Sequence, residues 1–160
     1  MSKPGHIVWE DSVGAAVNAR RRLPGLVSDY FAQGRELLAN EPKPPQLHAL
    51  RLATKRLRYT LELFRPCYGP GLRARLAALR RLQQLLGDVN DCATAAAELA
   101  KAARAKSPGR ARVDRFLQQR AQAQTAEFSR EWKQVFDAPG QQRWWTAYLT
   151  RHARPPGRRT

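Results

Sequence analysis

The side chains best able to do chemistry in this chain are cations that share one face of a predicted helix. At about 100° of rotation per residue, three of these cations fall within about 80° of a histidine on that face. The face carries His48, Arg51, Lys55 and Arg58, with Tyr59 close by. The opposite side carries Leu50, Leu57, Leu61 and Phe64. Because a planar arginine fork matches phosphate oxygens, the spacing predicts a helix with one core face and one anion-binding face.

A second cationic row follows in the next predicted helix. Arg73, Arg80 and Gln84 share one of its faces, whereas Arg75 falls on the apolar side, where the spacing gives it no role. From residue 43 to residue 81 the chain holds ten Lys or Arg and a single acid, Glu62. Like charges one turn apart repel by a few tenths of a kcal/mol per pair, so this shortage of acid indicates an external counter-charge. If the two helices pack antiparallel, their cationic faces flank one groove.

The polar residues around these rows allow more than one interpretation. His48 is expected in the first turn of its helix. It is interpreted either as a neutral side chain hydrogen-bonded to a loop or as a donor to phosphate beside Arg51. Metal ligation is a third, weaker interpretation. Asn90 and Asp91 are good N-caps for a following helix, and Asp91 could instead hold a neighbouring arginine in position.

The charge of the whole chain supports a polyanionic partner. Lys and Arg number 29 against 13 acids, which gives a formal net charge of +16 in 160 residues. Such a potential concentrates anions at the surface. A cationic helix face is often merely solvated, but two consecutive, acid-poor faces favour binding.

Cysteine and hydropathy patterns set the expected compartment. Cys67 and Cys92 have no CxxC partner, so neither a disulfide framework nor a cysteine-type zinc site is expected. There is no long apolar run and no signal-peptide core, so no membrane association is expected. The expected location is the cytoplasm.

Gly and Pro clusters divide the chain into helical pieces. We expect a lead-in over 1–10, a helical domain over 11–150 and a basic tail over 151–160. Helices are predicted over about 11–40, 46–66, 72–86 with a recapped continuation to 105, and 110–137, followed by a short helical segment over 141–150. A kink or restart is predicted at Pro24-Gly25 and a bend over 87–91. The last long helix should bury Val113, Phe116, Leu117, Phe128, Trp132, Val135 and Phe136. The fold class is therefore all-α, an antiparallel bundle of four main helices plus a short C-terminal helical segment.

The motif order between Leu47 and Asp91 resembles the CHAD family, the conserved histidine α-helical domain. The two patterns are HxLRxxxKRLRYxLExF, from His48 to Phe64, and LQxxLGxxND, from Leu82 to Asp91. The resemblance implies a helical bundle that binds inorganic polyphosphate through basic helix faces. Carried over position by position, it selects His48, Arg51, Lys55, Arg58, Arg80 and Arg81.

The chain departs from the family in carrying the motif once. Family members usually hold two copies of a four-helix unit, related by a pseudo-twofold axis. A single unit is expected either to bind weakly or to form a homodimer that rebuilds the double unit. The candidate interface is the aromatic segment with Trp144, Trp145 and Tyr148.

The function expected from the sequence is non-catalytic binding of inorganic polyphosphate, with no cofactor, no metal and no catalytic residue. The expected site is His48, Arg51, Lys55, Arg58, Tyr59, Arg73, Arg80 and Arg81. Polyphosphate granules are one place for such a protein. Binding of RNA or another nucleic acid is the alternative, although only Tyr59 is an aromatic placed within the cationic row. A phosphate-chain enzyme is not expected, because neither an ExExK motif nor a Walker GxxxxGK is present.

Overall fold

The computed structural model describes residues 7–102 and 108–157, and the regular structure of these residues is entirely helical. The long helices are α1 (Ala15–Leu38), α2 (Pro44–Leu63), α4 (Leu72–Ala102) and α5 (Pro108–Glu131). Shorter elements are α3 (Arg65–Tyr68), a 3₁₀ turn (Gly69–Gly71), a π-helical turn (Trp132–Phe136) and α6 (Gln141–Arg151).

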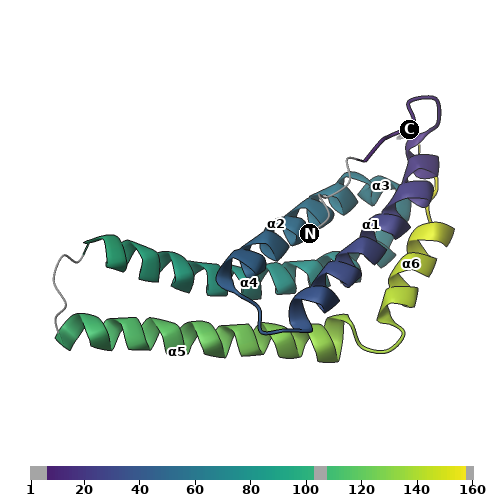
Figure 1. The fold of residues 1–160 in the computed structure, drawn as a ribbon. Coiled ribbons are helices and arrows are strands. Elements are labelled where there is room, and N and C mark those ends of the chain that lie inside the picture. Colours follow the sequence, from purple (N-terminus) through teal and green to yellow (C-terminus); the bar gives the residue numbers. More distant parts are fainter. Residues whose placement is uncertain (1–6, 103–107, 158–160) are drawn as a thin grey trace.

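The four long helices follow one another as antiparallel neighbours (Figure 1). In space, α1 packs on α2, α2 on α4, and α4 on α5, while α6 packs against α1. The outer parts of α4 and α5 extend beyond the other helices as a two-helix hairpin (Figure 1). The predicted all-α antiparallel bundle with a short C-terminal helix is confirmed.

An aromatic cluster fills the centre of the packed body. Phe31, Phe128, Trp132, Phe136 and Trp145 are each at most 4% exposed. Phe31 and Phe136 stack with ring centroids 4.8 Å apart, and Trp132 lies 4.8 Å from Phe136. Such pairs add specific geometry to a large buried apolar area. They join α1 to the π-helical turn and to α6.

One glycine permits this packing. A Cβ at Gly34 of α1 would collide with the six-membered ring of Trp132. The absence of a side chain therefore lets α1 approach the indole directly.

The predicted bend over 87–91 is wrong, because α4 runs without interruption from Leu72 to Ala102. Gly87 costs a helix about 1 kcal/mol relative to Ala, but the buried face continues through Leu86, Val89 and Cys92 on either side of it. Tertiary packing thus overrides the local breaker. Asn90 and Asp91 are interior positions of α4 rather than caps.

Two further details differ from the sequence prediction. Pro24 lies inside a single helix α1, with no restart, because Leu23 and Val27 are both buried beside it. Val113, Phe116 and Val135, expected in the core, are 45%, 57% and 55% exposed. For Val113 and Phe116 the reason is topological, since none of the other described helices covers this part of the α4–α5 hairpin.

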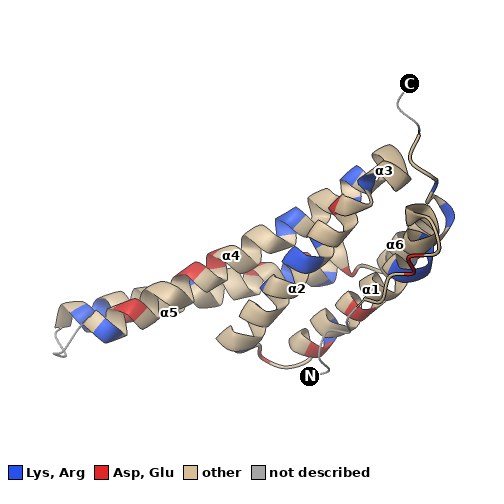
Figure 2. Ribbon diagram, turned by 90° about the horizontal axis from the view of Figure 1, so that it is seen from above, with Lys and Arg blue, Asp and Glu red and all other residues tan. Residues whose placement is uncertain are grey.

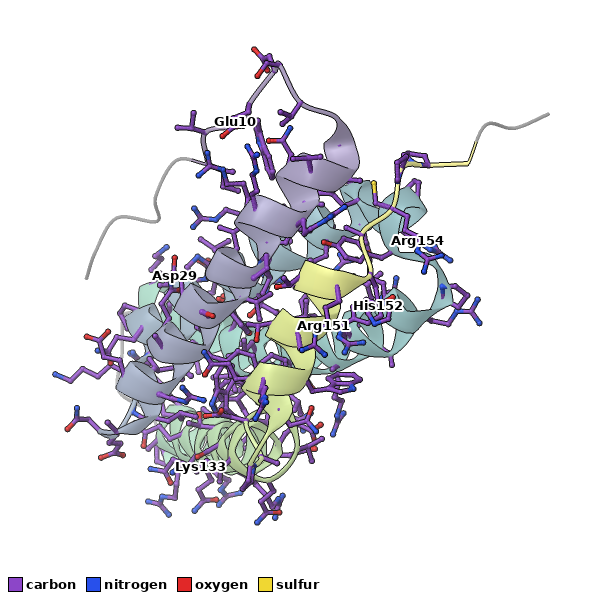
Figure 3. All side chains as sticks on the ribbon, turned by 90° about the vertical axis from the view of Figure 1, so that its right-hand side faces the viewer. Glu10, Asp29, Lys133, Arg151, His152 and Arg154 are labelled. Carbon is purple, nitrogen blue, oxygen red and sulfur yellow. The ribbon has the colours of Figure 1, made fainter. Side chains whose placement is uncertain are left out.

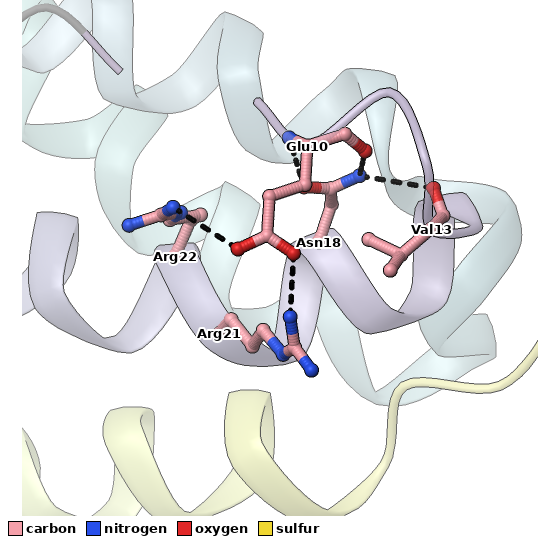
Figure 4. A network of polar contacts seen from close by, with 5 residues as sticks. All are labelled: Glu10, Val13, Asn18, Arg21 and Arg22. Atoms are coloured by element: carbon pink, nitrogen blue, oxygen red, sulfur yellow. Dashed lines mark hydrogen bonds and ion pairs between the residues drawn. The ribbon is translucent and has the colours of Figure 1, made fainter. Parts of the chain in front are cut away.

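The ends of the described chain are docked onto the body. Asn18 binds the backbone of Glu10 in both directions, at 3.0 and 2.9 Å, and Glu10 also pairs with Arg21 and Arg22 (Figure 4). At the other end, Ala153 is 3% exposed and the Arg154 amide donates to the Cys67 carbonyl at 2.8 Å. The compact unit therefore includes residues on both sides of 11–150. Residues 1–6 and 158–160 lie outside the described part.

Candidate functional site

A surface hollow of about 460 Å³ lies between α2 and α4. In Figure 2 the Lys and Arg positions gather where these two helices run side by side. The hollow is lined by Arg51 and Arg58 from α2 and by Arg80, Gln83, Gln84, Gly87, Asp88 and Asp91 from α4. The two predicted cationic faces therefore do flank one groove.

Arg58 is held firmly in the wall of this hollow. Its Nε donates to Gln83 Oε1 at 2.9 Å and its Nη1 donates to Glu62 Oε1 at 2.6 Å. The guanidinium carbon lies 4.3 Å from the centroid of the Tyr59 ring, and only 14% of the Arg58 side chain is exposed. These contacts fix the guanidinium before any ligand arrives, which reduces the entropy lost on binding.

Glu62 joins the two helices through a shared carboxylate oxygen. Arg80 Nη2 donates to Glu62 Oε1 at 3.1 Å, the same atom that accepts from Arg58. Arg58 and Arg80 still keep unused N–H groups, because each guanidinium has five. The single acid of the cationic segment thus positions two arginines on one side of the hollow.

Arg51 is the unpaired arginine of the hollow. Its Nε is buried and has no hydrogen-bond partner within the described residues. The close neighbour is Gly87, where an added Cβ would lie 3.9 Å from this nitrogen. Lys55, half-buried between Arg51 and Arg58 on α2, likewise has no partner among the described residues. These two side chains are free to meet an external anion.

The end of the hollow beside Gly87 carries negative charge. Asp88 accepts from Gln84 Nε2 at 3.0 Å, and Asp91 lines the hollow without an ion pair in the described part of the chain. Asp91 thus lies near the arginines but binds none of them directly. Three guanidiniums face two carboxylates here. The carboxylates of the hollow therefore lie toward the second half of α4, after Gly87.

His48 lies outside the hollow lining, next to α4. Its Nδ1 is 2.7 Å from Asn90 Oδ1, and because an amide oxygen only accepts, Nδ1 carries the proton of this bond. The ring is exposed, so Nε2 is available to a ligand. His48 is the fifth residue of α2, past the first turn where the sequence placed it. The expected capping role of Asn90 is replaced by this contact between helices.

Tyr59, Arg73 and Arg81 occupy different places around the hollow. Tyr59 is 48% exposed beside Arg58. Arg73 is exposed two turns before Arg80, about 10.5 Å along the same face of α4, and does not line the hollow. Arg81 points to α5, where it pairs with Glu127 at 3.0 Å and Glu131 at 4.0 Å. The structure thus brings Arg51, Arg58 and Arg80 together, with Lys55 and Tyr59 beside them.

Sequence reasoning left Arg75 without a role, and the structure gives it one. The side chain is 3% exposed, its guanidinium carbon lies 3.4 Å from the Trp144 ring centroid and 3.9 Å from that of Tyr148. It donates to the carbonyls of Gly71 and Trp144, at 3.0 and 2.8 Å. Burial lowers the pKa of Arg75 to about 10, partly opposed by Tyr148, so it is a cation at neutral pH. The sequence feature that could have predicted this role is an arginine on the apolar face of a helix in a chain with an aromatic C-terminal segment.

That aromatic segment is used within the chain. Trp145 is 1% exposed, and Trp144 covers Arg75. Trp144 itself remains 45% exposed. The segment expected at a dimer interface therefore already attaches α6 to α4.

Two negative observations concern the described residues only. Among residues 7–102 and 108–157, no three His, Cys, Asp or Glu side chains are grouped so that they could hold a metal ion. None of the helices described here is long and apolar enough to span a membrane.

Comparison with known proteins identifies the domain family of this chain but no individual relative. Neither curated proteins nor solved structures gave a match. The sequence model of the CHAD domain matches residues 5–100, which is more than half of the 160-residue chain and includes the whole α2–α4 hollow. The helices that supply Arg51, Arg58 and Arg80 are thus those that the family model describes, and the chain belongs to the CHAD domain family.

Proposed function

We propose that this protein binds inorganic polyphosphate in the α2–α4 hollow and does not catalyse a reaction on it. The observation that carries the proposal is the convergence of Arg51, Arg58 and Arg80 on one hollow, with the buried Nε of Arg51 lacking a partner among the described residues. The other N–H groups of Arg51 also have no partner among the described residues, so a phosphate oxygen in the hollow can accept hydrogen bonds from them. Membership of the CHAD family, which is associated with polyphosphate and triphosphate binding, supports the same ligand.

The arrangement fits a linear phosphate chain better than a single phosphate. Arg51, Lys55 and Arg58 follow one another at spacings of four and three residues, so the cations repeat about every 4.5–6 Å along α2. Arg80 faces them from α4. A chain with an anionic group at every phosphorus can meet successive cations, and charge-assisted bonds from arginine forks supply the binding.

RNA is the second candidate, and one feature favours it. Tyr59 is 48% exposed beside the hollow, with the Arg58 guanidinium against its ring. An exposed aromatic next to a cationic row can stack a base, which contributes about 1–3 kcal/mol. Polyphosphate has no base and would gain nothing from Tyr59.

The test uses two residues that can be changed without breaking a contact inside the protein. Arg51→Gln/Lys55→Gln removes the two cations that have no partner among the described residues. We expect its affinity for tripolyphosphate and for long-chain polyphosphate, measured by titration calorimetry, to fall about tenfold or more, because a hydrogen bond to a charged group contributes about 1.5–3 kcal/mol.

A matched control separates the hollow from the general charge of the protein. Arg112→Gln/Arg115→Gln on α5 removes the same charge from exposed residues far from the hollow (Figure 1). The control should bind like the wild type. Equal losses in both variants, or no loss in the first, would refute the proposal. Tight binding of single-stranded RNA that Tyr59→Ala abolishes would favour the second candidate.

A further inference from the structure

Two stretches that meet at the α3 end of the body contain no acid. Residues 63–87 and 138–160 include neither Asp nor Glu. They pack on each other through three backbone carbonyls: Tyr68 Oη donates to Leu149 O, Tyr148 Oη donates to Tyr68 O, and the Arg154 amide donates to Cys67 O, each at 2.8 Å. Positive charge is therefore concentrated where α3 meets the end of α6.

Four exposed arginines lie on the elements that form this junction, and we call them the α3–α6 end: Arg20, Arg65, Arg151 and Arg154. Arg20 reaches it from α1, where its Nη2 donates to the Ala153 carbonyl at 3.2 Å. Figure 3 labels Arg151, in the last turn of α6, and Arg154, in the segment that follows α6, while the labelled acids Glu10 and Asp29 lie on the α1 side. None of the four arginines has an ion pair within the described residues.

A buried cation beneath this surface adds to the same potential. Arg75 is 3% exposed and has aromatic rings and carbonyls around it, but no carboxylate. A buried charge without a counter-charge is costly, and its field extends to the nearby surface. The α2–α4 hollow differs, because Glu62, Asp88 and Asp91 lie in or beside it. The excess of positive charge is therefore larger at the α3–α6 end than in the hollow.

Arg73 lies on α4 between the α2–α4 hollow and the α3–α6 end. It shares a face of α4 with Arg80, about 10.5 Å nearer the start of the helix. It is exposed and unpaired among the described residues. Residues 65–68 of α3 are separated from α4 only by the turn Gly69–Gly71. A linear anion that leaves the hollow along α4 thus meets Arg73 and then the α3–α6 end.

We propose that the α3–α6 end is a second contact surface for the same polyanion, reached only by chains long enough to extend past the hollow. This inference rests on the proposed function. The hollow binds a short stretch of phosphates, and the α3–α6 end adds affinity as the chain lengthens. Affinity per molecule of polyphosphate therefore depends on chain length through Arg65, Arg151 and Arg154.

The experiment compares three ligands (tripolyphosphate, long-chain polyphosphate and single-stranded RNA) and three variants by titration calorimetry. Arg65→Gln/Arg151→Gln/Arg154→Gln, the end variant, removes three of the four charges of the α3–α6 end and leaves Arg20 and its hydrogen bond to the Ala153 carbonyl intact. Arg51→Gln/Lys55→Gln removes the free cations of the hollow. Arg112→Gln/Arg115→Gln/Arg120→Gln removes the same charge as the end variant from the exposed face of α5. Circular dichroism and thermal melting establish that each variant is folded.

We expect the end variant to lose about tenfold or more in affinity for long-chain polyphosphate and less than about twofold for tripolyphosphate. Its plot of log affinity against log salt should become shallower by about two to three, since each of the three lost phosphate contacts removes about 0.7–0.9 unit. The hollow variant should lose affinity for both polyphosphate ligands, and the α5 variant for neither.

Each other outcome decides against one of the two proposals. If the end and α5 variants lose long-chain affinity equally, or if neither loses any, the α3–α6 end is no binding surface. If the hollow variant binds normally while the end variant fails, the proposed function of the hollow is wrong and the end binds polyphosphate alone. If the end variant loses single-stranded RNA as strongly as polyphosphate, the surface binds nucleic acid and the inference is overturned.

Discussion

The two halves of α4 lie in different surroundings although they belong to one helix. In the first half, Leu72, Leu76, Leu79, Leu82 and Leu86 are at most 2% exposed, packed between α2, α5 and the body. Beyond Cys92 no described residue of α4 is buried, and in α5 the one buried residue is Phe128. The packed body thus gives way to a hairpin in which two helices cover only each other (Figure 1).

The difference shows that a helix can form with few buried residues when its own sequence has a high helix propensity. The outer half of α4 is rich in alanine, from Ala93 to Ala102, and alanine has the highest helix propensity. In the body, aromatic packing decides the geometry instead, because interiors are close-packed and tolerate few voids. The proposed binding surfaces lie on the packed body, where contacts with the core fix the helices that carry the arginines.

The largest expected effect is the loss of the central indole. Trp132→Ala should lower the free energy of unfolding by about 3–5 kcal/mol, because it leaves a cavity among Tyr30, Phe31, Phe128 and Phe136. Urea titration followed by circular dichroism measures it. A loss below about 1 kcal/mol would mean that the body is no better packed than the hairpin.

A smaller effect is expected when a methyl group is added opposite the same indole. Gly34→Ala should lower the free energy of unfolding by about 1–3 kcal/mol, since its Cβ collides with the Trp132 ring. Alanine alone favours a helix over glycine by about 1 kcal/mol, so a stabilised variant would show that α1 does not approach Trp132 this closely. Gly25→Ala, where an added Cβ meets nothing within 4 Å, is the matched control on α1.

The buried hydroxyl of Tyr30 should contribute about 1 kcal/mol to the free energy of unfolding and make that free energy depend on pH. Tyr30 Oη lies 2.7 Å from Thr54 Oγ1, and burial raises the pKa of the Tyr30 phenol above its ordinary value of 10.0. A raised phenol pKa stabilises the folded state below pH 10 and loses that contribution progressively as pH rises above it. Tyr30→Phe should therefore be less stable at neutral pH but lose less stability between neutral and strongly alkaline pH. Parallel pH profiles would contradict this prediction.

The smallest effect is expected on the hairpin. Val113→Ser/Phe116→Ser should change the free energy of unfolding by no more than about 0.5 kcal/mol, because both side chains are about half exposed. The same urea titration measures it. A large loss would show that these side chains are covered, and a simultaneous fall in molar mass by light scattering would assign the cover to a second copy of the chain. Amide exchange should also be faster in the hairpin than in the body.

Much of the fold was predictable from local patterns. The period of leucines and the positions of Gly and Pro determined an all-helical chain, an antiparallel order and the cationic faces of α2 and α4, because these depend on residues three to seven positions apart. They also predicted that the cationic faces flank one groove if the two helices pack antiparallel, which is where Arg51, Arg58 and Arg80 lie. The bend predicted over 87–91 failed because a local breaker costs about 1 kcal/mol, less than the packing of Val89 and its neighbours provides.

Only the tertiary structure decided what each arginine of α4 meets. Arg80 and Arg81 are adjacent, yet Arg80 joins Glu62 at the hollow and Arg81 joins Glu127 of α5, since one residue turns the side chain by about 100°. Arg75 lies between rings of α6 that are some 70 residues away in sequence. The sequence by itself thus determined how much positive charge there is and on which helix faces it lies. The packing of distant helices decided which of these charges are neutralised inside the protein and which remain for a ligand, because ion pairs and burial depend on neighbours in space.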